Sequence, residues 1–162
     1  MVKQRNMASV FLVSGERILL LFREGSRVAN QRWIASAGGH FEPGEINDAE
    51  ACALREMKEE LGILPTQLSG LRLRYITLRN TGGEIRINYF FFAELSGGPE
   101  LPLQSNEGRL QWFDLAQTAG LRQTFSGGAA LEHYREVGRF DHALYAGVSD
   151  GEKVIFTKMA EG

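Results

Sequence analysis

The middle of the sequence contains a helix whose beginning and end are both marked. Asn47 is a good N-cap residue, and Glu50, three positions later, completes a capping box. Gly62 suits the left-handed conformation that ends many helices, and Pro65 prevents continuation. With successive residues about 100° apart, the apolar side chains fall on one side, which we expect to be buried. These side chains are Ala51, Leu54, Met57 and Leu61.

The opposite side of this helix carries three glutamates, Glu56, Glu59 and Glu60. Like charges three or four residues apart repel, at a cost of roughly 0.2–0.5 kcal/mol per pair. One interpretation is an ordinary solvated face, since Glu, Lys and Arg are good helix formers. The other is a metal site, because oxygen ligands at these spacings converge on one side of a helix, as a hard divalent cation requires.

The remaining sequence is typical of strands joined by glycine-containing turns. Hairpin turns are predicted at Ser14-Gly15-Glu16, at Thr81-Gly82-Gly83 and at Ser149-Asp150-Gly151. Residues 38–44, GGHFEPG, have the composition of a turn, and residues 129–137 look helical. The predicted strands cover residues 7–13, 17–22, 33–37, 71–78, 84–95, 109–113, 144–148 and 153–157. We therefore expect an α+β fold with a central sheet and at least two helices.

Composition excludes several classes of protein. A chain of 162 residues that is 43% hydrophobic is expected to form a single domain over residues 1–162. A net charge of −2 gives no global basic field for a nucleic acid polymer. No run of 18 apolar residues predicts a membrane span, and the N-terminal pattern does not match a signal peptide. Cys52 is the single cysteine, which suits a reducing compartment, so a cytoplasmic location is expected.

Residues 38–63, GGHFEPGEINDAEACALREMKEELGI, resemble the signature box of the Nudix hydrolases. That box runs Gly, five residues, Glu, seven residues, Arg-Glu, apolar, any, Glu-Glu, any, Gly, apolar. Gly39 and Glu45 fit its first half, and residues 55–63 fit its second half at every specified position. The resemblance implies a Nudix-like α/β/α sandwich with a central mixed sheet flanked by helices.

The sequence departs from the box in two places. Nine residues instead of seven separate Glu45 from Arg55. Two extra residues inside the helix would rotate Glu45 by roughly 200° away from the other acids. The cap at Asn47 instead favours extra length at the junction of loop and helix, and the role of Glu45 stays open. In addition, Ala35-Ser36-Ala37 stands where family members often have Leu-Pro.

The resemblance also implies an activity and its residues. Nudix hydrolases use Mg²⁺ or Mn²⁺ to cleave a phosphoanhydride bond in a nucleoside diphosphate linked to another moiety, a small-molecule substrate. Carried over, the metal ligands are Glu56, Glu59, Glu60 and the backbone oxygen of Gly38, with Arg55 orienting a glutamate.

Two further groups are candidates for the site. Glu107 matches a later loop acid that acts as ligand or base, although an exposed loop acid is the alternative; the general base is Glu59, Glu56 or Glu107. Gly39, Arg86 and Asn88 are candidates for substrate contact, against the alternative of an exposed sheet face. Weaker candidates are Arg23, Arg27, Arg74 and Arg79 for phosphate, and Trp33 and Phe90–Phe92 for stacking on a base or for the core.

Three rival interpretations remain. A non-catalytic nucleotide-binding sensor domain usually lacks acids of the box, whereas all three are present here. An isoprenoid diphosphate isomerase would need a catalytic cysteine motif that the sequence does not show. A structural domain with a solvated acidic helix is the third. The oligomeric state is open, with a homodimer as one alternative.

Overall fold

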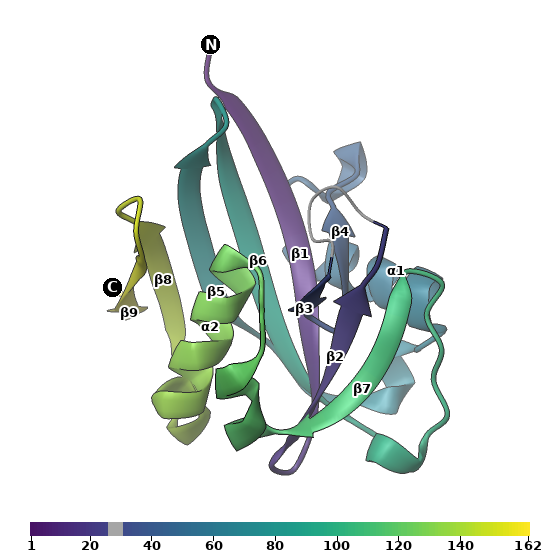
Figure 1. Cartoon of the computed structure of the whole chain (residues 1–162). Coiled ribbons are helices and arrows are strands. Elements are labelled where there is room, and N and C mark those ends of the chain that lie inside the picture. Colours follow the sequence, from purple (N-terminus) through teal and green to yellow (C-terminus); the bar gives the residue numbers. More distant parts are fainter. Residues whose placement is uncertain (26–30) are drawn as a thin grey trace.

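The computed structural model describes residues 1–25 and 31–162, and the strands within them form one mixed sheet (Figure 1). Arg27 therefore lies outside the described residues. The strands are β1 (Lys3–Ser14), β2 (Arg17–Arg23), β3 (Arg32–Ile34), β4 (Ala37–His40), β5 (Leu68–Thr81), β6 (Glu84–Leu95), β7 (Gly108–Asp114), β8 (Leu144–Ser149) and β9 (Val154–Met159). The α-helices are α1 (Ala49–Leu61) and α2 (Phe125–Glu136).

The sheet follows the order β3-β2-β1-β6-β5-β8-β9. Its centre is a parallel pair, in which β1 runs beside β6 from Lys3 opposite Glu84 to Val13 opposite Glu94. The β5–β8 pair is also parallel, whereas the hairpins β1–β2, β5–β6 and β8–β9 are antiparallel. This confirms the expected mixed sheet and the predicted hairpins.

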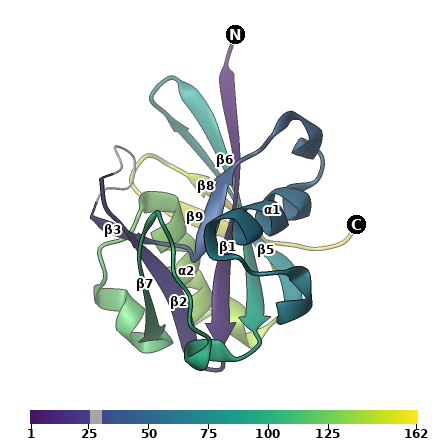
Figure 2. The same cartoon turned by 90° about the vertical axis from the view of Figure 1, so that its right-hand side faces the viewer.

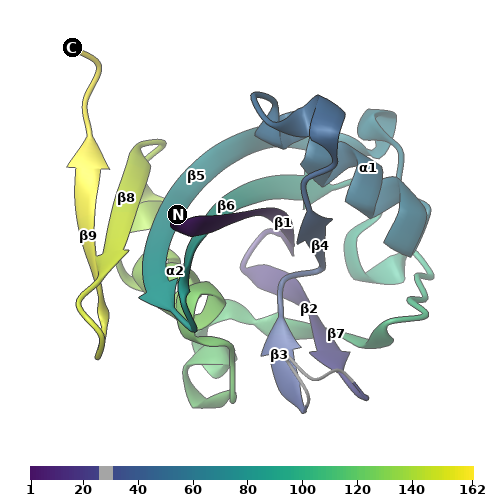
Figure 3. The same ribbon diagram turned by 90° about the horizontal axis from the view of Figure 1, so that it is seen from above.

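The edge of β1 that faces away from β6 pairs with two different strands. Its residues 7–10 pair with β4, and its residues 12–14 pair with β2, which in turn pairs with β7. Figure 3 shows β4 and β2 diverging from β1 on the side away from β8 and β9. Gly38 and Gly39 of β4, Leu21 and Arg23 of β2 and Glu107, just before β7, line one cleft at this fork.

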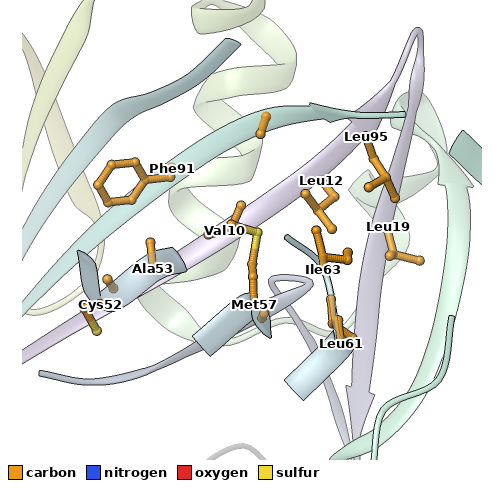
Figure 4. Close-up of a cluster of buried hydrophobic side chains, with 13 residues drawn as sticks. Val10, Leu12, Leu19, Cys52, Ala53, Met57, Leu61, Ile63, Phe91 and Leu95 are labelled. Carbon is orange, nitrogen blue, oxygen red and sulfur yellow. The ribbon is translucent and has the colours of Figure 1, made fainter. Parts of the chain in front are cut away.

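Hydrophobic clusters lie on both faces of the sheet. On one face, Met57, Ala53 and Cys52 of α1 pack against alternate residues of β1 and β6 (Figure 4). On the other face, Leu131 of α2 belongs to a cluster with Phe92. Figure 2 shows α1 in front of the sheet and α2 behind it. Because adjacent strand residues point to opposite faces, β6 supplies both layers, and the α/β/α sandwich is confirmed.

The aromatic residues considered for base stacking belong mainly to this core. Trp33, Phe91 and Phe92 are all less than 10% exposed and pack inside the two clusters. Phe90 is also buried, although its edge reaches the cleft described below. The core interpretation is therefore confirmed for Trp33, Phe91 and Phe92, because their rings already fill the space between sheet and helices.

Three local predictions need correction. The N-cap of α1 is Asp48, not Asn47, because Asp48 Oδ1 accepts a hydrogen bond from the Ala51 N–H at 3.0 Å. Residues 37–40 form strand β4, not a turn, because they pair with β1. Helix α2 begins at Phe125, four residues before the predicted start. Gly62 ends α1 as expected, with φ of 68°.

The described part of the chain contains no helix that is both long and apolar enough to span a membrane.

Candidate active site

The two extra residues of the box form a turn between β4 and α1. Pro43–Glu45 is a single turn of 3₁₀-helix, and the Asp48 N–H donates to the carbonyl of Glu45 at 2.8 Å. The side chain of Glu45 accepts from the Glu42 N–H at 2.9 Å and is buried. Glu45 thus lies outside the helix, and the turn returns its carboxylate to the side where the other acids of the box lie.

Arg55 connects four glutamates of the box. Its guanidinium donates to both carboxylate oxygens of Glu45, from Nε at 2.5 Å and from Nη2 at 3.1 Å. Nη1 donates to Glu56 at 2.9 Å and to Glu59 at 3.1 Å, while Nε lies 3.7 Å from Glu42. The hydrogen bonds from Arg55 lower the pKa of Glu45 to about 2, and the same pair raises the pKa of Arg55. Much of the like-charge repulsion on this helix is therefore balanced by one side chain.

Glu60 lies in a different environment. One of its oxygens accepts a hydrogen bond from the Gly38 N–H at 3.2 Å. Burial raises the pKa of Glu60 to about 8, and the nearby charges of Glu56 and Glu107 add to this effect. Among residues 1–25 and 31–162, no basic side chain lies within ion-pair distance of Glu60. The charged form of Glu60 is therefore unfavourable in the metal-free protein, because it is buried without a protein counter-ion.

Two glycines of β4 allow the acids to approach the sheet. A Cβ on Gly38 would come within 2.8 Å of the Ala8 carbonyl, which is too close for a side chain. A Cβ on Gly39 would collide with the carboxylate of Glu56. Glycine at these two positions thus leaves room for β4 to pair with β1 and for Glu56 to lie against its backbone.

Replacing Gly39 by Ala is expected to lower catalytic activity about 10-fold while the protein stays folded. The added methyl group must displace the carboxylate of Glu56. Because this carboxylate is the end of a flexible side chain, the fold should lose little stability, but the carboxylate leaves its place in the site. Steady-state kinetics and a thermal melt of the variant test this expectation. Gly44→Ala is the matched control, because a Cβ there meets no atom within 4 Å. Unchanged kinetics in Gly39→Ala would contradict the placement of Glu56 at the reacting centre.

A cleft of about 910 Å³ opens beside these acids. Glu56, Glu60 and Glu107 line it, although Glu107 comes from the turn before β7, more than forty residues after the helix. Arg23 holds Glu107 by an ion pair of 3.1 Å. From the sheet, half-buried side chains of β6 reach the same cleft, which Gly38 and Gly39 also border; these side chains are Arg86 and Asn88.

The structure also separates some predicted residues from the cleft. The side chain of Glu59 is 57% exposed and contacts Arg55 without lining the cleft. Arg74 is buried, bound to the carbonyls of Gly138 and Ala143 and to Asp141, and serves the packing of the C-terminal region. Of the weaker candidates, Arg23 and Arg79 line the cleft.

Sequence reasoning missed residues that line the cleft from other elements. Arg5 comes from β1, and Phe125 comes from the first turn of α2. The only signal for Arg5 was its place before a strand, and the pairing that puts it beside Arg86 was not visible. Phe125 stood outside the predicted helix, so nothing indicated its position.

The donor set fits a hard divalent cation. Its side-chain groups are carboxylate oxygens, the ligands that Mg²⁺ prefers. Burial and the neighbouring acids raise the pKa of Glu60, and a divalent cation bound there would favour its charged form instead. Within the described residues, no three acidic, histidine or cysteine side chains already form a closed metal-binding group. Arg55 draws Glu56 and Glu59 toward itself, while Glu60 is held at Gly38.

Comparison with known proteins gives a consistent result. No curated protein matches the chain. Solved structures match over most of its length, including a MutT protein from Bacillus halodurans, with 22% identity, a TM-score of 0.67 and coverage of 98% of this chain and 99% of that one. A MutT Nudix hydrolase from Burkholderia pseudomallei shares 25% identity with a TM-score of 0.64, covering 80% and 97%. The dihydroneopterin triphosphate pyrophosphohydrolase of E. coli shares 23% identity with a TM-score of 0.65, covering 84% and 99%.

A family model described as the NUDIX domain matches residues 3–132, which include the sheet centre, the box and the first two turns of α2. The chain therefore belongs to the NUDIX family.

Proposed function

We propose that this protein is a metal-dependent pyrophosphohydrolase that cleaves a phosphoanhydride bond in a small nucleotide-type diphosphate, with Mg²⁺ or Mn²⁺ as cofactor. The observation that carries this proposal is the convergence of Glu56, Glu60 and Glu107 on one cleft. The first two come from one helix and the third from a distant turn, which a merely solvated acidic face would not require. The arginines of the same cleft supply complementary charge for phosphate.

The chain's own residues supply binding and orientation. Glu56 and Glu60, which line the cleft, would hold the cation with the backbone oxygen of Gly38. Glu59 would complete the ligand set by turning its exposed side chain from Arg55 toward them. When bound, the cation supplies neutralisation of the diphosphate oxygens and a water of lowered pKa. Arg55 fixes the rotamers of the glutamates it contacts, through bonds of 2.9 and 3.1 Å to Glu56 and Glu59. Gly39 leaves the space in which Glu56 lies, and Arg86 and Asn88 would contact the substrate.

Glu107 is the residue we propose as general base, since it is held in place without belonging to the helix. Arg23 fixes its carboxylate at 3.1 Å at the border of the cleft. Replacing Glu107 by Gln is expected to lower kcat by about 100-fold, the lower end of the usual contribution of a general base. Measuring kcat and metal affinity separately tests this role. A variant with normal kcat but weakened metal affinity would identify Glu107 as a ligand instead.

A hydrolysis screen tests the proposed function directly. Purified protein is incubated with nucleoside triphosphates, nucleotide sugars and dinucleotides, each with Mg²⁺, with Mn²⁺ and with EDTA. We expect metal-dependent release of phosphate or nucleoside monophosphate from at least one class. Binding of a nucleotide without release from any compound would favour the sensor interpretation, and neither binding nor release would favour a structural domain.

The biological setting is proposed on simpler grounds. A net charge of −2 supports a small-molecule substrate over a nucleic acid polymer. Cys52, the single cysteine, is buried, and its thiol pKa is raised to about 12 by burial and by Glu45. An unreactive thiol of this kind is compatible with the reducing cytoplasm as the working compartment.

A further inference from the structure

Three arginines form a row across the centre of the sheet. Arg5 of β1 lies opposite Arg86 of β6, and Arg86 lies opposite Arg79 of β5. Side chains of directly opposed strand residues share one face, where like charges destabilise a sheet. All three arginines are half-buried and line the cleft. Such a row requires a compensating interaction.

The protein compensates this row only in part. Glu84, two residues before Arg86 on the same face, lies 2.8 Å from Arg86 and 3.5 Å from Arg5. Glu84 is also 3.9 Å from Lys3, so one carboxylate serves three cations. In the part of the chain that the structure describes, no carboxylate lies within 4.0 Å of Arg79, whose guanidinium stacks at 4.1 Å from the ring centre of Phe125. The row therefore keeps an excess of positive charge on the wall of the cleft.

The row lies away from the acidic cluster. On β1, Arg5 is four residues before Ser9, and Ser9 is paired with Gly38, where Glu60 is bound. At about 3.3 Å per strand residue, the two levels of the sheet are roughly 13 Å apart. Asn88 lies between these levels, opposite Met7. The guanidinium of Arg79 is held at the end of the cleft near α2 by its stacking on Phe125, so we assign an anion bound there to a different group of the ligand.

The beginning of α2 adds to the positive character of this end. Residues 125–127, the first turn of the helix, line the cleft, and Phe125 is the residue on which Arg79 stacks. The side chain of the N-cap, Thr124, makes no capping hydrogen bond. The first N–H groups and the positive end of the helix dipole thus face the same end of the cleft as the arginines.

We propose that the substrate carries a second phosphate group, remote from the phosphoanhydride bond that is cleaved, and that Arg79 and Arg86 bind it. This proposal rests on the proposed pyrophosphohydrolase function and narrows its substrate class to diphosphates with a further phosphate on the distal part. Arg79 is available for a bidentate phosphate contact because it has an aromatic support and no carboxylate partner among the described residues. The Nε of Arg86 donates to Glu84 at 2.8 Å, which keeps the Arg86 guanidinium at the same end of the cleft as Arg79.

Paired substrates that differ by one phosphate test the proposal. NADPH and NADH differ at the ribose 2′ position, and coenzyme A and dephospho-coenzyme A differ at the 3′ position. We expect kcat/KM to be at least about 10-fold higher for the phosphorylated member of one pair, the usual size of a charge-assisted contact. Arg79→Gln should reduce this ratio to about one. Arg72→Gln, an exposed arginine on the same strand that does not line the cleft, should leave the ratio unchanged.

A binding measurement without metal separates this proposal from the proposed function. In EDTA, calorimetry compares AMP with adenosine 2′,5′-bisphosphate and adenosine 3′,5′-bisphosphate. One bisphosphate should bind at least about 10-fold more tightly than AMP, and added salt or Arg79→Gln should remove the difference. If the protein hydrolyses these compounds but kcat/KM is the same for both members of each pair, the second-phosphate proposal alone is overturned. Bisphosphate preference without hydrolysis of any compound would overturn the pyrophosphohydrolase function alone.

Discussion

Replacing Glu60 by Gln is expected to reduce metal-dependent hydrolysis by more than about 100-fold, because residues that merely support a metal ligand already contribute 10–100-fold. The fold should survive. Glu60 is a buried carboxyl whose charged form is unfavourable in the metal-free protein, as its pKa of about 8 shows. The neutral amide removes that penalty and preserves the shape of the side chain.

The sign of the stability effect distinguishes a metal ligand from a structural residue. Because the pKa of Glu60 is higher in the folded state, the folded protein loses stability as pH rises from 4.5, the ordinary pKa of a glutamate, toward 8. In EDTA above pH 8, Glu60→Gln should therefore melt at a temperature equal to or above that of the wild type, and added Mg²⁺ should stabilise only the wild type. Glu50→Gln, an exposed acid of the same helix, is the control. Full activity of Glu60→Gln at saturating Mg²⁺ would refute the assigned site.

The largest loss of stability is expected for Arg55→Met. This change leaves the buried carboxylate of Glu45 without its bidentate partner, and breaking a buried ion pair from one side costs about 3 kcal/mol or more. For a chain of this size, that corresponds to a fall in Tm of about 10 °C. Chemical denaturation and thermal melts measure both values.

A second substitution tests the cause of that loss. Combining Arg55→Met with Glu45→Gln removes the unpaired charge, so we expect much of the lost stability to return. Activity should stay low, because Arg55 also holds Glu56 and Glu59. The pH dependence supplies a further check: the pair stabilises the fold above pH 4.5, and this contribution disappears as pH falls toward 2. Additive losses in the double variant would show that the two side chains act independently.

The acidic helix was predictable because its information is local. The cap, the terminal glycine and the apolar stripe all lie within residues 47–62, and the structure places α1 at Ala49–Leu61. The N-cap is Asp48 and not the predicted Asn47, an error of one residue, because Asn and Asp are equally good N-cap residues. The hairpins were predictable for the same reason, since their turns lie between adjacent strands.

The parts that were missed depend on contacts between distant segments. The position of Glu45 could not be derived from helical rotation, because a 3₁₀ turn and not the helix carries it. Arg5 and Arg86 are neighbours only because β1 and β6 pair in parallel, in a register that no turn specifies. The early start of α2 was hidden by Gly127 and Gly128, which have low helix propensity.

The parallel pairing of β1 with β6 also has a consequence for biosynthesis. The two strands are about eighty residues apart in sequence, and every other strand of the sheet is attached directly or indirectly to this pair. On the ribosome, the first strand and the acidic helix emerge long before their central partner is made. Synthesis from the N-terminus therefore delays cooperative folding until residue 95 or later, and a nascent chain stopped before that point would expose apolar strand edges to chaperones.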